Sequence, residues 1–463
     1  MMTDTTPTQV AALEAFLQDH PTIKFTAPTS PDYPAAREVW NGGRLDNPLA
    51  VVQPQTPTGV STIVKYAKAH KIPFTIRAGG HNLEGRSIVE GALLIDLRAL
   101  TDVTVSSDRQ SATVQGGILQ KELATKLWEE GLATPMGTIP GVGYVGWATY
   151  GGYGPFSAHW GLGVDQIISA TVVSPDGDIV TADETLLKGI RGGGGLFGVI
   201  LDLTIKVYPL KSLLTGAIVF NSQDIIKTVT DFNAAYEELL DTGIPPELYI
   251  QQISFNTPHG RVYAVLFVWS SDDTEEGLRW SEKIASLGPV IMNNVAPTGI
   301  PGWLTANGAF VPSKMFGISR TQNIRRITPE VAKVLGQTLD RMPSDPGTMF
   351  SIQQLRGVSA EAKSNSVFAT REPHLVLEIL GFTTEDEAKE ESEQWAKRAA
   401  EEFQQTDPNN TLPTVYISLL NTMGVESADV LRKAYGPHVP ELLALKERID
   451  PENVYSLAVP LLR

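Results

Sequence analysis

The stretch RAGGHN, residues 77–82, combines residue types that can do chemistry: two successive glycines and a histidine directly after them. The run IPFTIR, which leads into it, is typical of a buried strand. Two glycines after a strand can turn their N–H groups inward and form a nest for an anion such as a pyrophosphate. His81 would then lie beside a bound ligand. The alternative, in which His81 only makes a hydrogen bond within a loop, stays open at this point.

Two further glycine clusters compete for the same role. Gly141, Gly143 and Gly146 match G-x-G-x-x-G, but the dinucleotide-binding version needs a strand before the motif and a helix after it. Pro140 precedes the motif, and WATYGGYG follows it, which predicts a poor helix. The run RGGGG, residues 191–195, lacks the Lys-Ser/Thr pair of a P-loop.

A carboxylate in the second half of the chain is the main catalytic candidate. In HLVLEILGF, residues 374–382, alternation puts Glu378 on one face with His374 and apolar side chains. A carboxylate among such neighbours has a raised pKa or meets a partner, and with a raised pKa it could serve as a base. The alternative, pairing with an Arg or a backbone amide, stays open. The next candidates lie on neighbouring strands, and ordinary packing competes with catalysis for each: Tyr263, Gln354 and Gln252.

Metal, thiol and nucleic-acid chemistry have no support. The chain has no cysteine, and its seven histidines show neither an i, i+4 pair nor clustering with carboxylates, so we expect no metal site. A net charge of −15 makes nucleic acid an unfavourable partner. No apolar run approaches the length of a membrane span, and the first 20 residues lack the features of a secretory signal. We expect an intracellular, cytoplasmic protein that does not bind membranes.

The elements around these residues alternate in type. Residues 49–77 predict a strand, a helix and a strand, and two hairpins follow at 102–115 and 166–182. From about residue 213 the glycine density falls, and strands alternate with helices near 222–240 and 274–287. A charged segment at 384–405 predicts a solvated outer helix over a sheet. The predicted fold class is α+β.

Taken together, four segments resemble the berberine-bridge-enzyme-like branch of the vanillyl-alcohol-oxidase superfamily of flavoproteins. They are RAGGHN, the glycine-rich run 137–180, RGGGGLFGV and the closing YGPHVPELLALKERIDPENVY. The resemblance implies a two-part FAD-binding domain over residues 1–212, with its core at about 45–212, to which residues 421–463 return. It also implies a substrate domain over 213–420, whose antiparallel sheet is covered by helices. In this family the histidine at the position of His81 is bonded to the 8α-methyl group of FAD.

The same resemblance implies which residues contact FAD. Those expected there are Arg77, Ala78, Gly79, Gly80, His81, Asn82, Ser87, Pro140, Gly141, Val142, Gly146, Tyr150, Gly151, Gly154 and Val199.

Three departures from the family pattern limit what can be carried over. Ile139 occupies the place of a cysteine that gives many members a second flavin bond, so a single bond through His81 is the most this chain can form. Leu419 occupies the place of a tyrosine that often exchanges protons. The usual Asn-Gln-Asn near the C-terminus is Ala458-Val459-Pro460. The family's sugar and alkaloid substrates are therefore not carried over.

Three functions follow for comparison. The first is an FAD-dependent oxidase of a small alcohol, amine or sugar-like molecule, in which hydride passes to flavin N5 and O2 becomes H2O2. The second is a dehydrogenase that reacts poorly with O2. The third is a flavoprotein whose FAD is structural and whose pocket binds or cyclises a metabolite. Val142 stands where family oxidases have Val and dehydrogenases have Leu, so the resemblance implies an oxidase with O2 as its second substrate.

Overall fold

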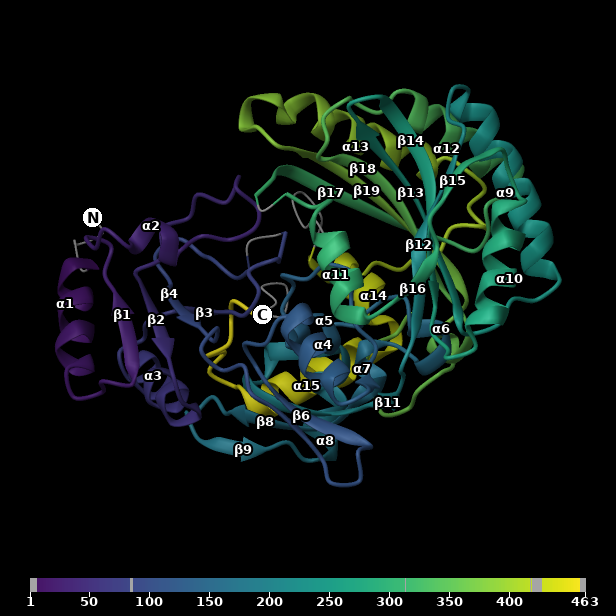
Figure 1. Cartoon of the computed structure of the whole chain (residues 1–463). Helices are drawn as coiled ribbons and strands as arrows, with labels where there is room; N and C mark the ends of the chain where they lie inside the picture. Colours follow the sequence, from purple (N-terminus) through teal and green to yellow (C-terminus); the bar gives the residue numbers. More distant parts are fainter. Residues whose placement is uncertain (1–5, 84–85, 313, 417, 419–426, 459–463) are drawn as a thin grey trace.

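The computed structural model describes residues 6–83, 86–312, 314–416, 418 and 427–458. Figure 1 shows two halves, with the first 212 residues in one and the large sheet of residues 213–383 in the other. Each half has its own apolar cores. The predicted α+β class is confirmed.

The first half begins with a four-stranded sheet in the order β1-β2-β4-β3. Its strands are β1 (Ile23–Thr26), β2 (Ala50–Pro54), β3 (Phe74–Arg77) and β4 (Leu93–Asp96). The predicted strand–helix–strand unit is confirmed as β2, α3 (Pro57–Ala69) and β3, but β4 lies between the two strands, parallel to both. The glycine loop that carries His81 leaves the carboxyl end of β3, which is the edge where parallel sheets commonly bind ligands.

An antiparallel sheet of five strands follows, in the order β5-β6-β10-β8-β9. The two predicted hairpins are confirmed, because β5 pairs with β6 and β8 pairs with β9. The strands are β5 (Val103–Val105), β6 (Ser111–Gln115), β8 (Ile167–Val173), β9 (Ile179–Thr181) and β10 (Val199–Lys206). The neighbouring helices include α4 (Gln120–Glu129), α5 (Tyr144–Thr149) and α8 (Glu184–Gly193). A poor helix was predicted after the G-x-G-x-x-G motif: α5 begins inside the motif and has only six residues, and no strand directly precedes the motif.

The second half is built on an antiparallel sheet of eight strands. Its path is β15-β12-β14-β13-β18-β19-β17, and β16 pairs with β12. The strands are β12 (Leu213–Phe220), β13 (Leu248–Thr257), β14 (Gly260–Trp269), β15 (Val290–Asn293), β16 (Ala296–Thr298), β17 (Phe316–Ile324), β18 (Thr348–Leu355) and β19 (His374–Thr383).

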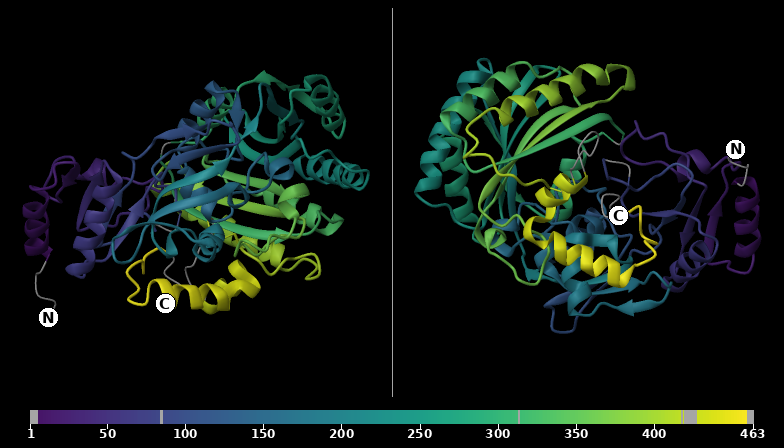
Figure 2. Two further views of the ribbon diagram at one scale, coloured as in Figure 1. Left: turned by 90° about the horizontal axis from the view of Figure 1, so that it is seen from below. Right: turned by 180° about the vertical axis from the view of Figure 1, so that it is seen from behind.

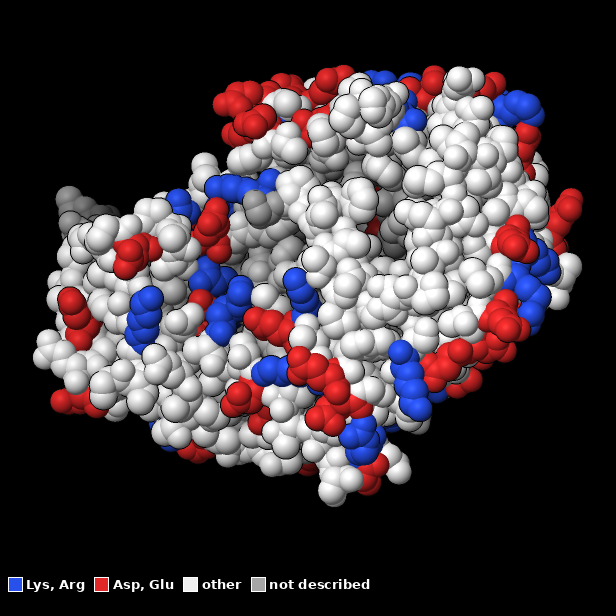
Figure 3. Space-filling model, in the orientation of Figure 1, with Lys and Arg blue, Asp and Glu red and all other residues white. Residues whose placement is uncertain are grey.

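Helices cover one face of this sheet and leave the other face turned toward the first half (Figure 1). The covering helices are α9 (Ile225–Asp241), α10 (Thr274–Ala285), α12 (Pro329–Asp340) and α13 (Lys389–Gln404). The predicted charged outer helix is α13, and acidic side chains gather over it in Figure 3. Its opposite side buries Trp395, Ala399 and Phe403 against the sheet.

The C-terminal helices α14 (Ser427–Tyr435) and α15 (Val439–Ile449) return to the first half (Figure 2). Their apolar side chains share a core with α8 and β10. At the end of α15, Lys446 Nζ lies 2.6 Å from Asp450 Oδ2 and donates to Leu196 O. The division into 1–212, 213–420 and 421–463 stays our proposal, and this packing supports it.

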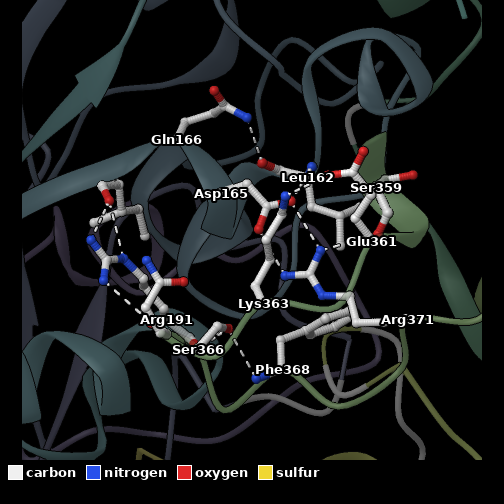
Figure 4. Close-up of polar contacts among 12 residues, drawn as sticks. Leu162, Asp165, Gln166, Arg191, Ser359, Glu361, Lys363, Ser366, Phe368 and Arg371 are labelled. Atoms are coloured by element: carbon white, nitrogen blue, oxygen red, sulfur yellow. Dashed lines mark hydrogen bonds and ion pairs between the residues drawn. The ribbon is translucent and has the colours of Figure 1, made fainter. Parts of the chain in front are cut away.

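A buried ion pair also joins the two halves. Arg371, which precedes β19, places two guanidinium nitrogens 2.8 and 2.9 Å from the carboxylate oxygens of Asp165 in the first half (Figure 4). The same guanidinium donates to Ser359 O. Because both side chains are less than a tenth exposed, removing either partner would leave an uncompensated buried charge. The pair therefore fixes the connection from β18 to β19 against the first half.

Candidate active site

One cavity of about 860 Å³ lies where the two halves meet. The glycine loops of the first half line one part of it, and the uncovered face of the large sheet lines another. The surface is hollowed between the halves in the view of Figure 3. This volume lies in the usual range for small-molecule and cofactor sites, about 300–1,000 Å³.

The loop around His81 is held by backbone contact that leaves no room for a side chain. A Cβ on Gly79 would lie 2.2 Å from Gly143 N, so only glycine fits there. Gly80 has a φ of +69°, in the region that favours glycine. A Cβ on Gly141 would lie 2.9 Å from His81 Nε2. The two predicted glycine clusters are therefore parts of one structure around the imidazole.

The environment of His81 keeps its imidazole neutral. Burial, with a smaller contribution from Arg98, lowers the pKa of His81 to about 4. A neutral imidazole keeps a lone pair on one ring nitrogen, which is the form that acts as a nucleophile. Trp40 stacks on the ring, with centroids 5.4 Å apart and an interplanar angle of 20°.

The cavity has the features that a dinucleotide such as FAD requires. Ser87 Oγ lines it and is buried without a hydrogen-bond partner among the residues that the structure describes, so a ligand can supply one. Gly146 and Gly195 also line it. A Cβ added to either would meet no atom within 4 Å, so the space beside both backbones is open to a ligand. Arg86 adds a positive charge to the lining. Backbone, hydroxyl and guanidinium groups of this kind suit a pyrophosphate.

Most residues expected at FAD line this cavity, and some do not. Those that line it are Ala78, Gly79, Gly80, His81, Asn82, Ser87, Val142, Gly146, Tyr150 and Val199. Those outside the lining are Arg77, Pro140, Gly141, Gly151 and Gly154. Arg77 instead donates to Asp96 Oδ2 at 2.6 Å and to Glu38 O, so its guanidinium joins β3 to β4 and to the segment between β1 and β2. The expected FAD contact of Arg77 does not fit that placement.

Glu378 lines the cavity from the sheet and is the end point of a buried hydrogen-bond chain. Ser351 Oγ donates to its Oε2 at 2.8 Å, and Gln353 Nε2 donates to its Oε1 at 2.6 Å. Gln251 Nε2 donates in turn to Ser351 Oγ at 2.6 Å. The alternation predicted for β19 is confirmed, because Leu380 and Phe382 also line the cavity whereas Leu375, Leu377 and Ile379 enter the core below the helices.

The electrostatics of Glu378 follow from its neutral partners. Burial raises the pKa of Glu378, and the hydrogen bonds from Ser351 and Gln353 lower it by less. Within the described residues, the carboxylate meets the side chains of Ser351 and Gln353 and neither an Arg nor a backbone amide, which was the alternative left open by the sequence. A carboxylate with a raised pKa and unshared lone pairs is equipped to accept a proton at neutral pH.

The other predicted catalytic residues face away from the cavity. Tyr263 Oη donates to Gln252 Oε1 at 2.7 Å, and Gln252 Nε2 donates to Asn233 of α9 at 2.8 Å. Gln354 Oε1 accepts from Tyr236 of α9 at 2.9 Å. The expectation that Tyr263, Gln252 and Gln354 meet the substrate does not fit these positions, which are on the helix-covered face.

Several lining residues carry no distinctive sequence signal. Tyr153 and Tyr416 lie with ring centroids 4.6 Å apart, and both line the cavity. His374 lies behind Tyr153: its Nδ1 is 2.7 Å from Glu372 O and must donate, so Tyr153 Oη donates to Nε2 at 3.1 Å. Each contact joins segments far apart in the chain, which no local pattern reveals. Leu419, Val459 and Pro460 lie outside the described residues.

Residues 48–183 match the FAD binding domain family. The chain is 31% identical to the FAD-linked oxidoreductase aurO of Gibberella zeae over 449 residues, which cover 96% of this chain and 87% of that protein. The chain belongs to the FAD-linked oxidoreductases. It is also 25% identical to (R)-6-hydroxynicotine oxidase of Paenarthrobacter nicotinovorans, over 92% of this chain and 93% of that one.

Two solved enzyme structures share the fold of this chain. 6-Hydroxy-D-nicotine oxidase from Arthrobacter nicotinovorans superposes with a TM-score of 0.81 at 22% identity, covering 93% of this chain and 96% of that one. Berberine bridge enzyme with (S)-reticuline gives 0.81 at 18% identity, covering 96% and 97%. The protein is an FAD-linked oxidoreductase. The residues that match the FAD binding domain family, 48–183, lie in the first half and include His81. Within the described part of the chain, no helix combines the length and apolarity needed to cross a membrane.

Proposed function

We propose that the protein is an FAD-dependent oxidase of a small organic molecule, an alcohol, an amine or a sugar-like compound. FAD is tethered by one bond to His81, Glu378 accepts a proton from the substrate, and O2 is reduced to H2O2. The observation that carries this proposal is that His81 and Glu378, which come from different halves of the molecule, line one cavity. Bound FAD supplies hydride acceptance and electron transfer to O2.

Glu378 is suited to the proton transfer by its fixed orientation. Ser351 and Gln353 each occupy one carboxylate oxygen, so the group cannot rotate without breaking a hydrogen bond. Each oxygen keeps a lone pair for a substrate O–H or N–H. Removal of that proton as hydride leaves the adjacent carbon avoids a high-energy cation on the oxygen or nitrogen.

The lining narrows the chemistry of the substrate. Among the described residues that line the cavity, Arg86 and Glu378 are the only arginine, lysine, aspartate or glutamate side chains. Around Glu378 the sheet presents Ile253, Leu266 and Leu380, which are apolar. An anionic substrate would meet the carboxylate without a compensating cation there. A neutral or cationic molecule with an apolar frame and one O–H or N–H at the reacting carbon fits better.

Two residues support a single histidyl bond: His81 can form it, and Ile139 cannot form a second one. His81 is neutral and lies in the cavity, so it has the lone pair that the bond needs. Ile139 lines the same cavity at the place where a second, cysteinyl bond would form. An isoleucine cannot form that bond.

O2 access is assigned to Val142, which lines the cavity. One added methylene can fill the small space that O2 needs beside the flavin, so Val142→Leu should slow reoxidation of the reduced enzyme without changing its anaerobic reduction. Stopped-flow mixing of photoreduced enzyme with aerated buffer measures this rate. Slow reoxidation of the wild type that Val142→Leu leaves unchanged contradicts the oxidase assignment.

An anaerobic screen tests the proposal as a whole. Small alcohols, amines and sugars are added to the enzyme, the flavin absorbance is followed, and air is then admitted. An oxidase bleaches with one class and recovers its colour rapidly as H2O2 forms. A dehydrogenase bleaches and recovers slowly. A protein with structural FAD, which uses the pocket to bind or cyclise a metabolite, does not bleach with any redox substrate.

A further inference from the structure

Trp40 lies at a junction between the flavin loop and the second half of the molecule. Its indole stacks on His81, and its ring edge meets Phe382 of β19 with centroids 5.3 Å apart. Its Nε1–H donates to Pro312 O at 3.1 Å, and its backbone N–H donates to Gly80 O at 3.1 Å. The side chain and the backbone of one residue therefore hold both the imidazole and the glycine that precedes it.

The stacking matters because His81 has no other orienting partner among the described residues. A functional histidine is usually oriented by a hydrogen bond to one ring nitrogen. Neither ring nitrogen of His81 makes a hydrogen bond within the described part of the chain, whereas His374 makes two and His159 makes one. Gly141 borders the imidazole close to Nε2 without contributing a side chain. The plane of the His81 ring is thus set by Trp40.

We propose that Trp40 is the positioning residue for flavin attachment: its stacked indole holds the His81 imidazole in the orientation in which a ring nitrogen can reach the 8α carbon of FAD. This inference rests on the tether proposed above. In the attachment, a nitrogen–carbon bond forms, the imidazole loses its N–H proton and the 8α carbon loses one hydrogen. The two electrons released pass through FAD to O2, which leaves as H2O2, so atoms and electrons balance. Phe382 and Pro312 fix Trp40 from the substrate half, so the tether forms only when the two halves are joined.

Three substitutions separate stacking from general packing. Trp40→Leu removes the ring, and Trp40→Phe keeps a stacking ring but loses the hydrogen bond to Pro312 O. Trp395→Leu is the matched control, because Trp395 is also an indole that donates to a backbone carbonyl, Thr338 O at 3.0 Å, but it lies on α13 outside the cavity. Trp40→Met replaces Trp40→Leu if the latter does not bind FAD.

The measurement is the rate at which apoprotein, supplied with FAD in air, acquires acid-stable flavin, beside the total FAD bound. We expect Trp40→Leu to bind FAD but to attach it roughly tenfold or more slowly, since misplacement of a reacting group by about 1 Å can cost 10²-fold. Trp40→Phe and Trp395→Leu should stay within about threefold of wild type. Attachment by Trp40→Leu at the wild-type rate, or equal losses in Trp40→Leu and Trp40→Phe, would overturn the inference. Wild type without acid-stable flavin would instead defeat the tether itself.

Discussion

The large sheet buries polar side chains on both faces, and the two sets differ in how their hydrogen-bond chains end. On the helix face, the chain from Tyr263 through Gln252 and Asn233 ends on the backbone carbonyl of Val229, which needs only a donor. On the cavity face, the chain from Gln251 through Ser351 ends on Glu378. The first chain is neutral and closed, whereas the second ends in a titratable group beside a cavity. Burial of polar groups alone therefore does not mark a site; an open, ionisable end does.

The largest expected effect comes from removing that ionisable end. Glu378→Gln keeps the shape and removes the basicity, so it should slow anaerobic flavin reduction by about 10²–10⁴-fold while FAD content stays unchanged. Stopped-flow absorbance with any substrate found in the screen measures the rate. Tyr263→Phe, on the other face of the same sheet, is the control and should reduce the flavin at the wild-type rate. If Glu378→Gln is as fast as wild type at every pH, the carboxylate is structural and the comparison fails.

A substitution on the helix-covered face of the sheet should change the stability of the protein and not the rate of flavin reduction. Tyr263→Phe leaves Gln252 Oε1 buried without its donor, which should lower the free energy of unfolding by about 1–3 kcal/mol. Urea unfolding followed by tryptophan fluorescence measures this difference. A variant with unchanged stability but slow flavin reduction would reverse the roles assigned to the two faces.

The smallest expected effect is a shift in the pH dependence of flavin reduction, which should differ between variants of the adjacent residues Gln353 and Gln354. Glu378 can accept a proton only when ionised, and burial raises its pKa, so flavin reduction should slow as pH falls through that raised pKa. Gln353→Leu removes a hydrogen bond that lowers the pKa, so the acid limb should move to higher pH. Hydrogen bonds to charged groups contribute about 1.5–3 kcal/mol.

Gln354→Leu is the control for this pH profile. The Gln354 amide bonds to Tyr236 on the helix face, so this substitution should leave the acid limb where it is in wild type. Rate profiles of the two variants from pH 5 to 9 make the comparison. Equal shifts in both, or no shift in Gln353→Leu, would show that the cavity face does not tune the carboxylate.

The same adjacent pairs show how far the sequence predicts the site. Glu378 was a candidate because it is the only carboxylate in a hydrophobic strand, and period-2 alternation correctly grouped it with Leu380 and Phe382. The two Gln-Gln pairs, at 251–252 and 353–354, have no such signal. In each pair the first glutamine faces the cavity and the second faces a helix. The second of each pair, Gln252 and Gln354, was predicted at the site from the sequence. A shift of one residue reverses the face of every strand side chain, so only the paired strands decide.

Long-range contacts explain what else the sequence left out. The hairpins and the β2–α3–β3 unit were predictable because their signals are local. Insertion of β4 between β2 and β3 was not, because strand order depends on the whole sheet. Trp40 was not predicted at the site, since its partners His81 and Pro312 are distant in the chain and meet it only after both halves fold.

Acid precipitation tests most directly whether His81 is bonded to FAD. Wild-type protein precipitated in acid should keep its yellow colour in the pellet, and the tryptic peptide AGGHNLEGR, residues 78–86, should carry the mass of the flavin. His81→Ala should still bind FAD through the glycine loops but release it into the supernatant. Wild-type colour in the supernatant, with an unmodified peptide, would contradict the proposed tether.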